Sequence, residues 1–341
     1  MLRKFEGYTK GINLGGWLSQ CDNTKEHLDS FITEKDIATI AGWGVDHVRV
    51  PVDYHIFRDE NGNNLEDGFA HIDDCLSWCE KYNLNMVLDL HKTAGYIFDE
   101  KEIPFFFEKE LQDKFVSLWQ EFAERYSKYH ERLCFELLNE VVDENLSEVW
   151  NDIADRAIKA IREISPDIRI IIGGAKNNSV FCVKNLRAPS DRNIVFTFHC
   201  YEPLIFTHQA AYWVEGMPSD FSMNFPVDFE EAEKYTRMYL TAQHADLYSR
   251  SEKAEIDKDF FIKLFKNAVD ICEKYDVMLY CGEYGVIDRA PTDATLGWYS
   301  AMHEAFEESG IARAAWTYKS KDFGITDEHY SEIKDEIIKL L

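Results

Sequence analysis

Short apolar segments alternate with helix-like segments along the whole chain, and this alternation restricts the possible folds more than any other feature of the sequence. Apolar runs of this length, bounded by polar segments, are typical of strands buried in a parallel sheet. They predict eight strands, at residues 11–17, 45–52, 86–91, 133–140, 169–174, 193–201, 277–285 and 311–318. Amphipathic patterns predict helices near residues 33–43, 72–79, 111–129, 144–164, 259–275 and 293–309, and from residue 327 onwards. Eight strands alternating with helices predict a (β/α)8 barrel, also called a TIM barrel.

An open, doubly wound parallel sheet is the alternative to the closed barrel. It is disfavoured because neither a Gly-x-Gly-x-x-Gly segment nor a phosphate-binding loop follows an early strand. No internal repeat and no low-complexity linker divides the 341 residues. We therefore expect a single catalytic barrel domain over residues 1–341, a length that barrels reach when they carry insertions.

One segment, residues 203–258, breaks the regular alternation. It is much longer than an ordinary barrel loop, and we expect an insertion subdomain over the active-site face, with a helix near residues 229–249. Aromatic side chains are concentrated there, as they are in the loop after the third strand. Such a group can form a local core or a wall on which a ligand stacks, and its position at one rim favours binding for some members. Those of the insertion are Phe206, Tyr212, Trp213, Phe221, Phe225 and Phe229.

The charge of the chain argues against two classes of partner. The sequence has 37 Lys and Arg against 62 Asp and Glu, a net charge of −25, whereas nucleic acids and anionic membranes attract positive charge. No apolar run is long enough to span a membrane, and residues 1–10 lack the apolar region of a signal peptide. We expect a cytoplasmic protein, or a secreted one if a signal has been removed. Eight cysteines without Cys-x-x-Cys spacing suit buried free thiols, with Cys75 and Cys79 on one helix face of the core.

Charged and polar side chains occur at the ends of the predicted strands, where a barrel carries its catalytic groups. Glu140 ends the fourth strand, and Glu283 lies near the end of the seventh. Packing does not account for a carboxylate there, because a buried charge is costly unless it is paired or solvated. Strands four and seven face each other roughly across a small barrel, so the two carboxylates can approach. The other strand-end candidates are Arg49, His91, Asn139, His199, Tyr201 and Trp316.

Two carboxylates in different protonation states are what glycoside hydrolysis requires, because one donates a proton while the other attacks or activates water. Arg49 and Tyr201 are suited to stabilise an ionised Glu283. Proximity to that anion, with partial burial, is expected to raise the pKa of Glu140. The amide of Asn139 suits a sugar hydroxyl.

Other strand residues have plainer interpretations. Trp316 offers a flat apolar face to a sugar ring, although a single tryptophan is more often a core residue. Glu136 lies deeper on the strand face that carries Glu140, and we expect it to pair with a barrel arginine. Asp89 is expected to support its neighbours rather than to contact a ligand.

Seven short motifs, in their order and spacing, resemble those of glycoside hydrolase family 5, in the clan whose acid/base follows strand four and whose nucleophile lies on strand seven. The motifs are GINLGGW (11–17), VRVP (48–51), DLH (89–91), LNE (138–140), FHCY (198–201), GEYG (282–285) and AWTY (315–318). The resemblance covers nearly the whole chain. It is greatest to small clostridial-type endoglucanases of this family, which also carry a long insertion after strand six.

The resemblance implies a retaining double displacement, with Glu283 as the nucleophile and Glu140 as the acid and then the base. Arg49 and Tyr201 are expected to hold Glu283, and His199 to lie beside Glu140. We expect no metal and no other cofactor. The expected sugar-binding residues are His91, Asn139 and Trp316, with Asn13, Trp213 and Lys319 as additional contacts.

The expected activity is that of an endo-β-1,4-glucanase, a monomer acting on soluble or mixed-linkage β-glucan polysaccharide or oligosaccharide. One departure from the family is the segment 92–94, Lys-Thr-Ala, where relatives often have a second histidine. A β-mannanase or a β-1,3-glucanase on the same scaffold is the alternative. The presence of both carboxylates opposes a carbohydrate-binding barrel without activity. A metal-dependent hydrolase with Asp89, His91 and His199 as ligands is disfavoured, because strand one lacks the His-x-His that such sites usually carry.

Overall fold

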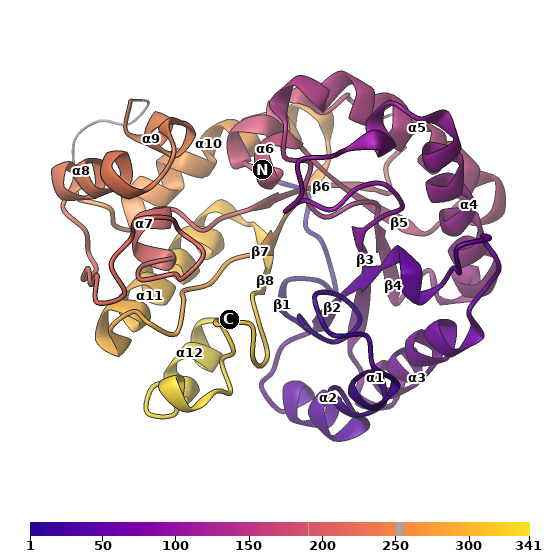
Figure 1. Cartoon of the computed structure of the whole chain (residues 1–341), viewed down its shortest axis with the longest axis horizontal. Coiled ribbons are helices and arrows are strands. Elements are labelled where there is room, and N and C mark those ends of the chain that lie inside the picture. Colours follow the sequence, from indigo (N-terminus) through magenta and orange to yellow (C-terminus); the bar gives the residue numbers. More distant parts are fainter. Residues whose placement is uncertain (190, 250–254) are drawn as a thin grey trace.

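The computed structural model describes residues 1–189, 191–249 and 255–341, and its centre is a closed barrel of parallel strands in the order β1 to β8 (Figure 1). The strands are β1 (Lys10–Asn13), β2 (His47–Asp53), β3 (Asn85–Lys92), β4 (Leu133–Glu136), β5 (Arg169–Gly173), β6 (Ile194–His199), β7 (Met278–Glu283) and β8 (Ala312–Ala315). The predicted (β/α)8 barrel is thus confirmed. Its eighth strand pairs with the first and closes the sheet.

Several strands are shorter than predicted, most clearly β4, which ends at Glu136 instead of residue 140. The chain beyond Glu136 still bonds both neighbouring strands. The N–H of Leu137 donates to Ile171 O, and the N–H of Asn139 donates to Leu90 O, each over 3.1 Å. Residues 137–140 are therefore held at the rim of the barrel although they leave the regular strand.

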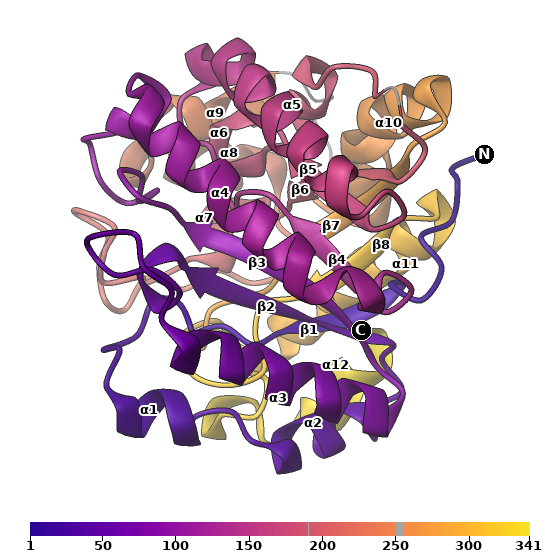
Figure 2. The ribbon, with the colours of Figure 1, turned by 90° about the vertical axis from the view of Figure 1, so that its right-hand side faces the viewer.

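Helices surround the barrel, as Figures 1 and 2 show. They are α1 (Lys25–Ser30), α2 (Glu34–Ala41), α3 (Glu66–Tyr82), α4 (Lys109–Tyr126), α5 (Ser147–Ile164), α6 (Ala175–Asn178), α7 (Leu204–Thr207), α8 (Phe229–Tyr239), α9 (Ala242–Ser249), α10 (Lys258–Tyr275), α11 (Thr292–Ser309) and α12 (Lys334–Leu340). After β5 the described residues form only α6 and a 3-10 helix, Val180–Asn185. Lys176 and Asn177 have φ values of 59° and 54°, so a regular α-helix cannot continue through them.

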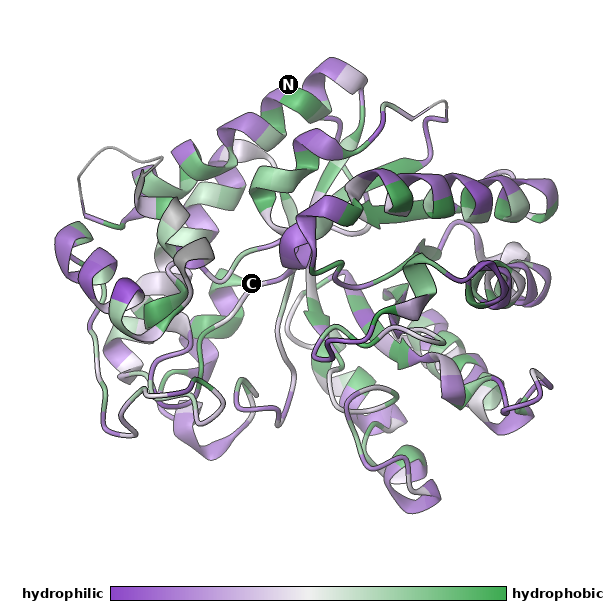
Figure 3. Ribbon diagram, turned by 45° about the horizontal axis from the view of Figure 1, so that its top comes forward, coloured by the Kyte–Doolittle hydropathy of each residue, from purple (hydrophilic) through white to green (hydrophobic). Residues whose placement is uncertain are grey.

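Local chemistry explains where the helices begin and which face they bury. The side chain of Asp257 accepts a hydrogen bond from the N–H of Phe260 at the start of α10, which ends at Asp276 in the left-handed conformation. Figure 3 shows hydrophobic helix faces turned toward the barrel and hydrophilic faces turned outward. On α3, Cys75 and Cys79 are buried as predicted, and all eight cysteines are free.

The barrel interior is apolar at one level and charged at another. Phe5 and Tyr8, which precede β1, stack with ring centroids 4.5 Å apart and join an apolar cluster of strand residues. Arg49, Asp89 and Glu136 are fully buried nearer the strand ends, and register places Asp89 opposite Glu136. Burial of these charges is tolerated because they pair with one another.

Three helices, α7, α8 and α9, follow β6 inside the predicted insertion and lie together beside the barrel (Figure 1). The helix predicted at residues 229–249 is two helices, α8 and α9. Residues 250–254 of the predicted insertion lie outside the described residues, and its independence as a subdomain stays a prediction. No helix in the described part of the chain is long and apolar enough to cross a membrane.

Candidate active site

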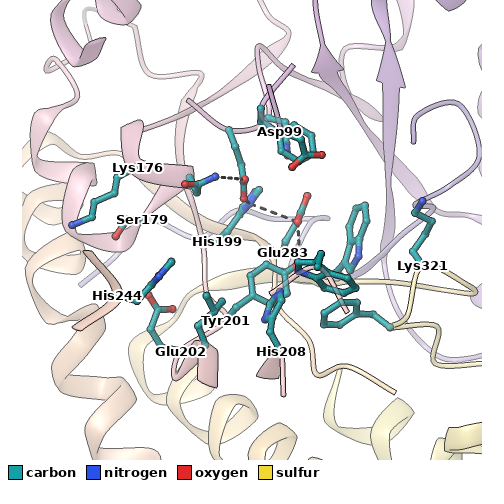
Figure 4. A pocket seen from close by; sticks show the side chains of 18 of the residues that line it. Asp99, Lys176, Ser179, His199, Tyr201, Glu202, His208, His244, Glu283 and Lys321 are labelled. Carbon is teal, nitrogen blue, oxygen red and sulfur yellow. Dashed lines mark hydrogen bonds and ion pairs between the residues drawn. The ribbon is translucent and has the colours of Figure 1, made fainter. Parts of the chain in front are cut away.

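A cavity of about 1100 Å³ lies over the C-terminal ends of the strands. This is the rim at which barrels carry catalytic groups. Its lining comes from the ends of β3, β4, β6, β7 and β8 and from the insertion (Figure 4). The predicted site residues that line it are His91, Asn139, Glu140, His199, Tyr201, Trp213, Glu283 and Trp316.

Glu140 and Glu283 meet at His199. Nδ1 of His199 lies 2.7 Å from Oε1 of Glu140 and 3.7 Å from Oε2 of Glu283. Ligand-type atoms of the three residues, one from each, all lie within 4.8 Å of one another. An oxygen of Glu140 therefore approaches an oxygen of Glu283 to within that distance. The sheet contributes to this approach, because a register shift between Phe198 and His199 places His199 opposite Glu283.

A fully buried guanidinium, that of Arg49, holds Glu283 from inside the barrel. Nη1 donates to Oε1 of Glu283 over 2.7 Å. Nε and Nη2 bond both oxygens of Glu136 over 2.7 and 3.0 Å, which is the predicted pairing of Glu136 with a barrel arginine. The hydroxyl of Tyr201 donates to Oε2 of Glu283 over 2.9 Å. Both oxygens of Glu283 therefore accept hydrogen bonds from the protein.

The surroundings of Glu283 keep it ionised. Burial favours the neutral acid, but the positive charges of His199 and Arg49, with the hydrogen bond from Tyr201, outweigh burial and lower the pKa of Glu283 to about 2. Burial also favours a neutral His199, yet the negative charges of Glu283 and Glu140 raise the pKa of His199. Burial and the nearby carboxylates raise the pKa of Tyr201, so its phenol stays neutral and donates.

Glu140 has a different set of partners. Besides the contact with His199, its Oε2 accepts from Nδ2 of Asn177 over 2.9 Å, and its backbone oxygen accepts from the hydroxyl of Tyr96 over 2.5 Å. The side chain of Glu140 is 13% exposed, against 7% for Glu283. The two carboxylates thus meet in one cavity from unlike environments, which is what an acid and a nucleophile need.

His91 and Trp316 form a flat wall of the cavity. Their rings are parallel to within 8°, with centroids 5.8 Å apart. Nδ1 of His91 bonds Oδ2 of Asp89 over 2.7 Å, which fixes the ring and gives Asp89 the expected supporting role. Next to this wall, Oδ1 of Asn139 accepts from Arg49 over 2.9 Å, so the orientation of the Asn139 amide is set by the same guanidinium that holds the nucleophile candidate.

Three predicted residues do not line the cavity, and Asn13 is the clearest correction. Its side chain is fully buried, and Nδ2 donates to backbone oxygens of β7 and β8. Its Oδ1 accepts from Arg49 over 2.9 Å, because the β1–β2 register sets these two residues side by side. The predicted sugar contact of Asn13 is wrong. Arg49 itself lies below the cavity and acts on Glu283 rather than on a ligand.

The sugar contact of Lys319 stays a prediction, and the structure gives this side chain another partner. Its Nζ pairs with Oδ1 of Asp36 in α2, over 3.1 Å, and the residue does not line the cavity. The lysine of this loop that does so is Lys321, whose Nζ donates to Gln20 O over 2.7 Å. β8 ends at Ala315 and residues 320–322 have positive φ, so the alternation of the strand does not extend to this loop.

Residues of the loops and helices beyond the strand ends complete the cavity, and few of them could be recognised from the sequence. Figure 4 shows Lys176 and His244 on one side of His199 and Lys321 on the other, with Asp99 above. For the cavity residues that come from the segment 203–258, the length and aromatic content of that segment were the only signal in the sequence. The main residues of this group are Asp99, Lys176, Asn177, Glu202, His208, His244, Tyr248 and Lys321.

Only one group of three or more His, Cys, Asp or Glu side chains among the described residues could hold a metal ion, namely Glu140, His199 and Glu283. The alternative ligand set of Asp89, His91 and His199 does not converge. Asp89 is instead shared between His91 and Arg49, over 2.7 and 3.1 Å.

A family model, two similar sequences and a similar solved structure all relate this chain to cellulases. The family model for Cellulase (glycosyl hydrolase family 5) matches residues 8–322. Cellodextrinase A of Ruminococcus flavefaciens is 43% identical over 312 residues, which cover 91% of this chain and 85% of that protein. Endoglucanase C of Acetivibrio thermocellus is 41% identical over 339 residues, with 98% of each chain covered. The crystal structure of endoglucanase Cel5A from Thermotoga maritima superimposes with a TM-score of 0.77 at 25% identity, covering 98% of this chain and 97% of that one.

Proposed function

The chain belongs to glycosyl hydrolase family 5 and is a glycoside hydrolase, and from this premise we propose that it is a retaining endo-β-1,4-glucanase. The match confirms the family that the seven motifs predicted. The names of the two relatives, an endoglucanase and a cellodextrinase, support glucan chains, including short soluble ones, as the substrate. The remaining support comes from the geometry of the cavity.

The short distance between the carboxylates of Glu140 and Glu283 is the observation that best supports a retaining mechanism. Carboxyl groups of retaining enzymes lie about 5–5.5 Å apart, whereas inverting enzymes need about 6.5–9.5 Å to admit a water molecule. Oxygens of Glu140 and Glu283 lie within 4.8 Å of each other, which supports direct attack by one carboxylate. Glu283 has the lowered pKa and the fixed oxygens of a nucleophile.

In the first step, Glu140 donates its proton to the glycosidic oxygen as the bond between that oxygen and the anomeric carbon breaks. An oxygen of Glu283 bonds the same carbon, which gives a covalent glycosyl-enzyme. In the second step, Glu140 takes a proton from water, the water oxygen bonds the anomeric carbon, and Glu283 leaves. The product therefore regains the starting β configuration.

His199 is placed to serve both steps. Negative charge resides on Glu283 before the first step and on Glu140 after it. Nδ1 of His199 lies within 3.7 Å of an oxygen of each carboxylate. Its N–H can stabilise the charge at either position without a large movement, which lowers the reorganisation that the reaction needs.

Product analysis tests the proposal. ¹H NMR of the first products from a soluble cello-oligosaccharide should show the β-anomer before mutarotation. Appearance of the α-anomer first would mean that the enzyme inverts the configuration. Carboxymethylcellulose, barley glucan, laminarin, mannan and xyloglucan should then be compared at equal concentration. Fast loss of viscosity on the first two supports endo-β-1,4-glucanase action. A preference for mannan or laminarin would replace the substrate assignment by the β-mannanase or β-1,3-glucanase alternative.

A further inference from the structure

The carboxylates and imidazole of the candidate active site have the composition of a transition-metal site. Two carboxylate oxygens and one imidazole nitrogen converge there, and the three side chains are 13%, 1% and 7% exposed for Glu140, His199 and Glu283. Zinc binds imidazole nitrogen and carboxylate oxygen in proteins, and sites with three protein ligands leave the fourth position to water or a substrate. Here that position faces the cavity, which all three residues line.

The distances agree with such a site. Ligand atoms about 2.0–2.2 Å from a tetrahedral zinc ion lie about 3.3 Å from one another. Nδ1 of His199 is 2.7 Å from Glu140 and 3.7 Å from Glu283, so these two spacings lie on either side of that value. The third spacing, between Glu140 and Glu283, is at most 4.8 Å. Binding of one ion by all three atoms requires rotation of the side chains.

The charge around the site also favours a cation. Arg49 is fully buried, but it faces three carboxylates, those of Asp89, Glu136 and Glu283. Glu140 adds a fourth acidic group, whereas the basic groups of the cluster are Arg49, His199 and His91. Acidic groups therefore outnumber basic ones by four to three. Such a surplus suits a transition state that develops positive charge on the sugar, and it attracts a small metal ion for the same electrostatic reason.

We propose that Glu140, His199 and Glu283 bind a free divalent transition-metal ion, for which Zn²⁺ is the probe, and that the bound ion blocks hydrolysis. The blocking part rests on the proposed function, whereas the binding part does not. Zn²⁺ takes the place of the proton between Nδ1 of His199 and Oε1 of Glu140, and that proton passes to solvent. Mg²⁺ and Ca²⁺ bind poorly here, because they prefer oxygen ligands and higher coordination numbers.

Calorimetry on the purified full chain measures binding without reference to activity. We expect one Zn²⁺ per chain at this site, competition by cellobiose, and no comparable binding of Mg²⁺. His199→Asn and Glu140→Gln should each weaken Zn²⁺ binding at least about 10-fold, because loss of a ligand costs at least as much as loss of a supporting residue. Circular dichroism shows whether each variant is folded, and either one suffices for the comparison.

Other metal-binding side chains of the cavity provide the controls. Cys21 and His244 also line it and lie outside the proposed catalytic residues, so Cys21→Ser and His244→Gln should bind Zn²⁺ as the wild type does. Activity measured in parallel should fall with Zn²⁺ in competition with substrate and return on addition of a chelator. Unchanged affinity in His199→Asn, or affinity lost in Cys21→Ser, would overturn the proposal. Absence of hydrolysis with Zn²⁺ binding intact would overturn the proposed function instead.

Discussion

Arg49 donates a hydrogen bond from Nη1 to Oε1 of Glu283 over 2.7 Å while its own side chain is fully buried. The same guanidinium bonds Glu136 through two nitrogens and contacts Asp89 over 3.1 Å. Lysine cannot reproduce this planar set of donors. One side chain therefore links the structural charges inside the barrel to Glu283, the proposed nucleophile, at its rim.

Replacement of Arg49 by lysine should reduce both activity and stability. We expect kcat/KM to fall at least about 100-fold, since Glu283 loses an aligned donor. The free energy of unfolding should fall by at least about 3 kcal/mol, because buried acceptors are left without partners. Urea unfolding and steady-state kinetics provide the two measurements. Arg187→Lys is the matched control, since Arg187 forms its ion pairs at the surface, and it should change stability by less than about 0.5 kcal/mol.

Glu283→Gln should abolish most of the chemistry and spare binding. The amide keeps the shape of the side chain but cannot attack the anomeric carbon, so kcat should fall at least about 10³-fold while the affinity for a cello-oligosaccharide stays similar. Calorimetry and initial rates measure the two quantities. Glu304→Gln, on the exposed face of α11, controls for loss of a carboxylate. An active Glu283→Gln enzyme would disprove the assignment of the nucleophile.

The pH dependence of stability provides a separate test of Glu283. Its folded pKa of about 2 lies below the value of about 4.3 for an unfolded glutamate. The stabilisation is therefore fully present above the unfolded pKa and is lost as pH falls toward the folded pKa. Since pH 3 lies roughly 1.3 pH units below the unfolded pKa, the free energy of unfolding should be about 2 kcal/mol lower at pH 3 than at pH 6 from this group.

Urea unfolding at pH 6 and pH 3 measures this effect. The wild type should lose about 2 kcal/mol more than Glu283→Gln between the two pH values, because the variant has no carboxyl group to titrate there. Equal losses in the two proteins would contradict the lowered pKa of Glu283.

The role of Trp213 can be tested against another exposed aromatic residue. Trp213 lines the cavity and is 46% exposed, whereas Phe107 is 71% exposed and lies outside the cavity lining. Trp213→Ala should raise KM for cello-oligosaccharides about 3- to 10-fold with little change in kcat, since stacking on an aromatic ring contributes on the order of 1 kcal/mol. Phe107→Ala should leave both constants unchanged. Equal kinetics in the two variants would assign Trp213 to packing.

The barrel and its central chemical groups could be predicted from the sequence alone. The side-chain periodicities of strands and helices differ, so each of the eight buried strands could be recognised from its own segment. The strands of such a barrel are parallel, so the residues at their C-terminal ends lie at one rim. Glu140, Glu283, His199 and Tyr201 were found by that argument, which needs no knowledge of loop paths. The pairing of Glu136 with a barrel arginine followed from the cost of burying a charge.

Which neighbours of these residues face the cavity depends on the packing of elements that are distant in the sequence. Asn13 was misplaced because the β1–β2 register sets it beside the buried Arg49. Lys319 lies beyond the end of β8, where strand alternation no longer applies, and it pairs with Asp36 of α2. Asn177 and His244 could not be found, since they come from a left-handed turn and from a helix of the insertion. Periodicity reports which face of its own element a residue occupies. Contacts between elements distant in sequence depend on how the chain closes in space, and that information is not local.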